Sequence, residues 1–257
     1  MVQLIERKVK QKEKLVRRYK MSELVEVLLG EKTLVKINND LKEINSINKL
    51  YKDILLNEAC DNCEFKNNHT KKILPIINSS ADVMIITENA SQSEINAEQL
   101  LSDPKGKTLL GFLGKLDTDI KDIYITPITK CYSKEIQFNT ALRCASKYIL
   151  NEVAFIKPKL IVTIGELPMK IIKSIYFDIP NHQDLKLATE RKEIHKLTKD
   201  ISTIEGLDMP INFVHTISPK NILNANGEMQ SKLKKVLWHD LKIIDKFKAA
   251  LDKEKSA

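Results

Sequence analysis

Residues 156–165, IKPKLIVTIG, contain the stretch that decides the fold. Residues 160–164 (LIVTI) are apolar except for one threonine and mostly β-branched, which is typical of a strand buried on both faces. Three other runs share this character, namely residues 82–87 (DVMIIT), 123–126 (IYIT) and 211–215 (INFVH). We therefore expect four short strands that are buried on both faces.

Helical patterns lie between these strands, over residues 140–155 and 166–176. Strands that alternate with helices predict a parallel sheet with helices on both sides. In such sheets the ligand site lies beyond the carboxyl ends of the strands. Four places follow predicted strands in this way: residues 87–94, residues 127–131, Gly165 and residues 216–221. The polar stretch 177–207 is interpreted as an insertion or a long loop.

The charge of the chain is concentrated at its start. The 257 residues carry a net charge of +8, and residues 1–20 contain eight basic residues against two acidic ones. A basic helix there can be a solvated arm, or it can lie on a polyanion such as nucleic acid, with Arg17 and Arg18 among the contacts. A second basic, helical segment covers residues 231–255, with apolar residues spaced as a buried face.

The composition excludes several classes of protein. No run approaches the ~18 apolar residues that span a bilayer, and the first residues lack an apolar signal region, so we expect neither membrane insertion nor secretion. The expected location is the cytoplasm, associated with the nucleoid or in a virus-infected cell. The chain has only seven glycines, and neither GxGxxG nor GxxxxGK[ST] occurs, which argues against a phosphate-cradling nucleotide enzyme.

All four cysteines fit one arrangement. Cys60 and Cys63 form a CxxC, Cys131 follows the second predicted strand, and Cys144 lies in the next helix. Four thiolates from two distant segments can share one metal centre. The alternative is that they are ordinary buried cysteines. Spacing alone does not separate zinc from an iron–sulfur cluster.

Eight segments stand in a characteristic order along the chain: Cys60–Cys63, residues 87–91 (TENAS), 106–114 (GKTLLGFLG), 126–131 (TPITKC), Cys144, residues 156–165 (IKPKLIVTIG), 216–223 (TISPKNIL) and 238–242 (WHDLK). Their order and cysteine spacing resemble the uracil-DNA glycosylase superfamily, and most closely its family 4, the iron–sulfur enzymes. The corresponding family motifs are CxxC, GEAPG, GxPFVGxAG, TNVVKC, a fourth cysteine, IKPKxIVxLG, a THP loop and WxDLK. The resemblance covers about residues 50–247.

The resemblance implies a fold and a cofactor. The fold would be a three-layer α/β/α sandwich with a central four-stranded parallel sheet, preceded by a helical extension. We accordingly divide the chain into a basic helical extension, residues 1–45, and a glycosylase-like domain, residues 46–257. The metal centre would be a structural [4Fe–4S] cluster held by Cys60, Cys63, Cys131 and Cys144, with zinc as the alternative.

Three positions of the implied base pocket have changed. Leu109 replaces the phenylalanine that stacks on the base, and Pro127 replaces the asparagine that reads the uracil edge. Ser218 replaces the histidine that supports the developing uracil anion, because Pro219 fits the family's HP step. The loss of one preorganised donor typically lowers the rate by ~10²–10³. We therefore expect little or no uracil excision.

Other features are retained. Glu88 and Glu94 match the acidic positions of the family, and with Asn89 and Ser218 they are the candidate catalytic residues. A pair of carboxylates could polarise a water or stabilise a sugar cation, although both could be ordinary acids of a loop or a helix start. Seven residues are candidates for contact with nucleic acid, which are Arg17, Arg18, Lys107, Lys130, Pro219, Lys220 and Asn221. Their alternative is that they are exposed polar loop residues.

Three functions follow from these features. The first is a DNA-binding accessory factor of replication or repair, with DNA and replication or repair proteins as partners. The second is an active DNA glycosylase that hydrolyses the N-glycosidic bond of a flipped nucleotide carrying uracil or another modified base. The third is a protein-interaction module whose basic arm binds an acidic partner.

Overall fold

A computed structural model describes residues 47–56, 63, 71–76, 78, 80–177, 182–190, 195–196 and 211–256. The basic extension, with Arg17 and Arg18, lies outside these residues, as does Cys60. None of the described helices is long and apolar enough to cross a membrane.

The four predicted strands form a parallel sheet. β1 (Val83–Thr87), β2 (Ile123–Pro127), β3 (Leu160–Ile164) and β5 (Asn212–Thr216) lie in the order β2-β1-β3-β5. The expected four-stranded parallel sheet is therefore confirmed. The short strand β4 (His195–Lys196) adds an antiparallel edge beside β5, within the stretch that we interpreted as irregular.

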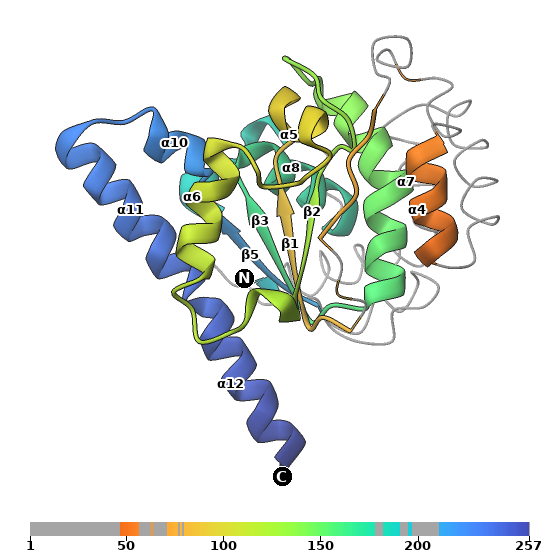
Figure 1. The fold of residues 1–257 in the computed structure, drawn as a ribbon. Coiled ribbons are helices and arrows are strands. Elements are labelled where there is room, and N and C mark those ends of the chain that lie inside the picture. The colour runs from red at the N-terminus through yellow and green to blue at the C-terminus, as the bar shows by residue number, and fades with distance from the viewer. Residues whose placement is uncertain are drawn as a thin grey trace, which may run out of the picture.

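Alternate strand residues enter two separate cores, which explains why the strands are apolar throughout. Figure 1 shows helices on both sides of the sheet. Met84 and Ile86 face the core that α7 (Phe138–Ile156) and α8 (Glu166–Tyr176) cover. Val83 and Ile85 face the other core. That second core is covered by α5 (Gln92–Ala97), α6 (Pro104–Leu113), α10 (Pro219–Leu223), α11 (Gly227–Leu241) and α12 (Ile243–Ser256).

The C-terminal segment, residues 231–255, falls into two helices instead of one. α11 ends at Leu241 and α12 begins at Ile243. The start of α12 is held by Thr118, whose main-chain N–H and hydroxyl both donate to Asp245 Oδ1, at 3.0 and 2.9 Å. Leu237, Leu241 and Ile244 are fully buried under this junction. Three short elements complete the described fold: η3 (Ile120–Asp122), η4 (His182–Asp184) and α9 (Leu187–Glu190).

α4 (Ile47–Leu56) forms a further layer outside α7. Its residues Leu50, Tyr51 and Ile54 pack against Tyr148 of α7. The Tyr51 hydroxyl also lies 3.3 Å from the hydroxyl of Tyr124 in β2, so a buried hydrogen bond joins α4 to the sheet.

Candidate active site

A small cavity lies at the carboxyl ends of β1 and β3, where the strand order predicts a ligand site. Its volume is about 30 Å³, room for about two water molecules. It collects Glu88, Asn89, Glu94, Ser218 and Pro219 from two distant parts of the sequence. The remaining lining residues are Thr87, Ala90, Leu100, Leu101, Asp103, Lys105, Gly106, Leu109 and Ile164.

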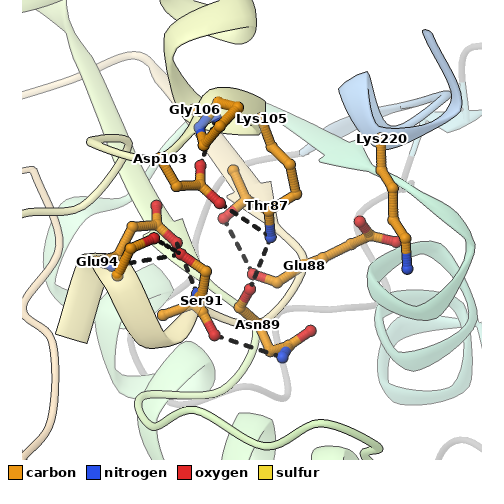
Figure 2. Close-up of polar contacts among 12 residues, drawn as sticks. Thr87, Glu88, Asn89, Ser91, Glu94, Asp103, Lys105, Gly106 and Lys220 are labelled. Atoms are coloured by element: carbon orange, nitrogen blue, oxygen red, sulfur yellow. Dashed lines mark hydrogen bonds and ion pairs between the residues drawn. The ribbon is translucent and has the colours of Figure 1, made fainter. Parts of the chain in front are cut away.

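Glu88 is held over Gly165. The Ser218 hydroxyl donates a hydrogen bond to Glu88 Oε2 at 2.6 Å. Gly165 has a φ of 99°, and a Cβ at this position would lie 2.7 Å from Glu88 Oε1. The missing side chain of Gly165 therefore makes room for this carboxylate. Figure 2 shows the Glu88 side chain extending from its loop toward Lys220.

Glu94 has the structural role that was the alternative to catalysis, that of an acid at a helix start. It is buried, and its Oε2 accepts hydrogen bonds from the main-chain N–H and the hydroxyl of Ser91, at 2.7 and 2.8 Å. Its Oε1 accepts from the main-chain N–H of Leu101 at 2.7 Å. Ser91 and Glu94 form a capping box at the start of α5. The predicted catalytic pair is thus reduced to Glu88, because both Glu94 oxygens are engaged by the fold.

Asn89 is also engaged by main-chain oxygens, one of them in the loop that follows β2. Its amide Nδ2 donates to the main-chain oxygen of Ser133 at 3.0 Å, and it lies 3.4 Å from that of Ala90. Because both amide protons have main-chain acceptors, Asn89 links the loop that carries Glu88 to the loop that contains Ser133.

Lys105 is a pocket residue that the sequence patterns did not indicate. Its ammonium lies 3.6 Å from Asp103 Oδ2 and 3.5 Å from the main-chain oxygen of Asn89 (Figure 2). Asp103 is the N-cap of α6 and accepts from the main-chain N–H of Gly106 at 2.7 Å, and Pro104 follows it. An Asp-Pro pair is a recognisable helix start, and it could have placed Lys105 in the first turn facing the ligand end of the sheet.

The three substituted positions are all buried. Leu109 lines the cavity, and Pro127 stands opposite Thr87 at the ends of β2 and β1. Ser218 is the N-cap of α10, so the register of the loop is the one expected from Pro219. The nearby His215 does not take its place, because it is fully buried in β5 with Nδ1 2.7 Å from the Thr163 hydroxyl.

The candidate DNA-binding residues divide by exposure. Lys107 on α6, and Lys220 and Asn221 on α10, are exposed. Pro219 is buried at the first position of α10 and lines the cavity. The expectation for Lys130 is wrong, because it is only 1% exposed.

Lys130 belongs instead to a buried polar network. Its ammonium lies 2.7 Å from Glu152 Oε1 and donates to Thr126 Oγ1 and to the Pro127 oxygen, at 2.5 and 3.2 Å. Burial raises the pKa of Glu152, and the charge of Lys130 opposes that rise. Burial also raises the pKa of Tyr124. A charge pair so enclosed cannot reach a phosphate, so its role is within the fold.

Described residues on either side of the CxxC segment contact the segments that carry Cys131 and Cys144. Cys144 on α7 packs against α4, the helix that precedes the CxxC. After the CxxC, the main-chain N–H of Ile73 donates to the oxygen of Lys130 at 2.9 Å, next to Cys131. Among the described residues, no three His, Cys, Asp or Glu side chains lie close enough together to hold a metal ion. Thiolates are suitable donors for iron or zinc. Cys63, Cys131 and Cys144 do not form a metal-binding group among the described residues, and Cys60 lies outside these residues.

Comparison with known proteins gives one match. The family model of the uracil DNA glycosylase superfamily matches residues 74–242, which include the whole cavity and every strand of the sheet. A comparison with curated proteins finds no match.

Proposed function

The chain belongs to the uracil DNA glycosylase superfamily, and on that premise we propose that it is a DNA-binding accessory protein of repair or replication with little or no uracil excision. Proteins of this superfamily act on DNA, and phosphate contacts do not require an intact base pocket. The proposal therefore separates DNA binding from catalysis.

One observation carries this proposal: the side chains at the positions expected to read a uracil lack a donor or donate to protein acceptors. Ser218 donates to Glu88, and Asn89 donates to the main-chain oxygen of Ser133 in the loop that follows β2. Pro127 has no side-chain donor. A site must offer hydrogen-bond partners to select a base by its edge.

The surface that supports DNA binding lies at the mouth of the cavity. α6 and α10 pack against each other, and they expose Lys107 and Lys220 respectively. Leu223 is 44% exposed and lies on the same short helix, α10, as Lys220, so this helix presents an apolar and a basic side chain. Apolar side chains next to basic ones are a common means of engaging the DNA base stack.

Two measurements test the proposal. Affinity for a duplex should fall by more than about tenfold between 50 and 200 mM salt, and Lys107→Ala with Lys220→Ala should weaken it and flatten the salt dependence. Lys121→Ala, an exposed lysine at the opposite end of β2, is the matched control. In a strand-cleavage assay, a uracil-containing duplex should stay intact. Salt-independent affinity, or rapid uracil release, contradicts the proposal.

A second candidate function is that of a glycosylase for another base, and the fixed position of the Glu88 side chain favours it. The Glu88 carboxylate accepts a hydrogen bond from Ser218 and occupies the room that Gly165 leaves. A carboxylate fixed in this way could stabilise a sugar cation. Release of hypoxanthine or hydroxymethyluracil that is abolished by Glu88→Gln would establish this activity. The same experiment would refute the non-catalytic function.

We also propose that Cys60, Cys63, Cys131 and Cys144 hold one metal centre of structural role, with a [4Fe–4S] cluster as the expected group. The contacts of the residues on either side of the CxxC segment and the thiolate chemistry support it. Iron analysis of protein purified without oxygen is the test, and one tightly bound zinc without iron would refute the cluster. Replacement of any one cysteine should lower the unfolding midpoint if all four share a centre.

A further inference from the structure

Lys105 can donate one more hydrogen bond, whereas the hydroxyl and amide donors of the cavity already have protein acceptors. The hydroxyls of Thr87 and Ser218 and the amide of Asn89 all have protein acceptors. The Lys105 ammonium has three protons, one directed to the Asn89 oxygen and another toward Asp103. Its side chain is 28% exposed, so a ligand in the cavity can reach it.

The positions that would contact a base are substituted, whereas an acidic group that would contact a sugar is present. Leu109, Pro127 and Ser218 stand where the base would be stacked, read and stabilised. Glu88 remains in place, and Lys105 adds a primary amine. The cavity has a volume of about 30 Å³ for water-sized groups, so it has room for an aldehyde group beside Lys105.

We propose that the ligand of this cavity is an abasic nucleotide in DNA, and that Lys105 Nζ forms an imine with C1′ of its open-chain sugar. This assignment rests on the proposed binding of DNA at α6 and α10. It adds a covalent activity toward one DNA lesion, with Lys105 as the catalytic residue.

The chemistry needs no reactant other than the aldehyde. Asp103 Oδ2, 3.6 Å from Lys105 Nζ, accepts a proton, and the nitrogen lone pair then adds to C1′ to form a C–N bond. The carbonyl π electrons move to oxygen, which takes up that proton. A second proton from nitrogen allows the oxygen to leave as water, and the nitrogen lone pair closes the C=N bond. Two ammonium protons thus leave in the water, and no electrons are exchanged with another group.

Borohydride trapping tests the assignment. The full-length protein is incubated with a labelled duplex that contains one abasic site, and borohydride reduces any imine to a stable amine. We expect a covalent adduct on a denaturing gel, with Lys105 identified as the modified residue by peptide mass spectrometry. Lys105→Arg keeps the charge but cannot form this imine, so the adduct should fall by about tenfold or more. Lys121→Arg is the control for exposed lysines, and its yield should equal that of the wild type.

A duplex with a tetrahydrofuran site, which has no aldehyde, measures DNA binding separately. Binding of this duplex without an Lys105-dependent adduct on the abasic duplex overturns the imine and leaves the proposed function standing. Absence of binding to either duplex overturns the proposed function and the imine together. Adducts that map to other lysines, or that persist unchanged in Lys105→Arg, also overturn the assignment.

Discussion

The replacement of Gly165 by alanine tests how the Glu88 carboxylate is seated. Gly165 has a φ of 99°, a conformation that costs a non-glycine residue ~1–3 kcal/mol. The new Cβ would lie 2.7 Å from Glu88 Oε1 and 2.9 Å from both Cδ and Cγ. Since the contact is with a side chain, Glu88 would move and lose its bond from Ser218, a further ~1.5–3 kcal/mol for a hydrogen bond to a charged group.

Gly165→Ala should therefore lower the free energy of unfolding by ~2.5–6 kcal/mol, as measured by urea denaturation. In a Glu88→Ala background only the backbone strain remains, so the same substitution should be milder by ~1.5–3 kcal/mol. Gly111→Ala is the control, because a Cβ there meets nothing within 4 Å and alanine favours the helix. An equal effect of Gly165→Ala in both backgrounds would refute the contact between Gly165 and Glu88.

Three further predictions concern packing and buried charge. Gly106→Ala should be more disruptive than Gly165→Ala in thermal unfolding, because its Cβ would lie 2.2 Å from the Cα of Leu101, where backbone and not a flexible side chain must move. Lys130→Met should lower the free energy of unfolding by ~3–5 kcal/mol, since it leaves Glu152 buried without its partner, and Glu152→Leu in the same protein should recover part of the loss in urea denaturation. Burial raises the pKa of Tyr51 from 10.0 to about 12, so above pH 10 the folded state retains a proton that the unfolded state loses. The free energy of unfolding should therefore fall as the pH rises above 10. When unfolding is followed from pH 9 to 12, this fall should be shallower in Tyr51→Phe.

The sheet could be predicted from the sequence because each strand is buried on both faces. Residues 160–164 have no polar alternation, so the run stands out, and the structure places β3 at the same residues. The boundaries of α8 were also predictable, because Gly165 precedes it and its apolar residues follow a helical period. β4 was not, because its two residues carry no strand pattern and are held only by pairing with β5.

The position of the candidate site could be predicted from the sequence, but the role of each side chain could not. The motif order directed attention to Glu88 and Ser218, which the fold brings into contact. Glu94 was assigned to catalysis although Ser91 stands three residues before it, the spacing of a capping box. Lys130 was assigned to DNA binding because its burial could not be foreseen. That burial depends on Glu152, and no sequence pattern links the two residues. Which lysines are buried is decided by tertiary partners that local patterns do not reveal.

The two bonds of Ser218 bear on whether the change at this position can be reversed. Its hydroxyl donates to Glu88 Oε2 at 2.6 Å and accepts from the main-chain N–H of Lys220 at 3.2 Å, so one oxygen both anchors the carboxylate and caps α10. A mutation to histidine would restore an imidazole at the family position but would remove both bonds at once. Leu109 and Pro127 would still lack the means to hold a base. On the proposed function, Ser218→His alone should therefore lower the stability of the protein without producing uracil excision.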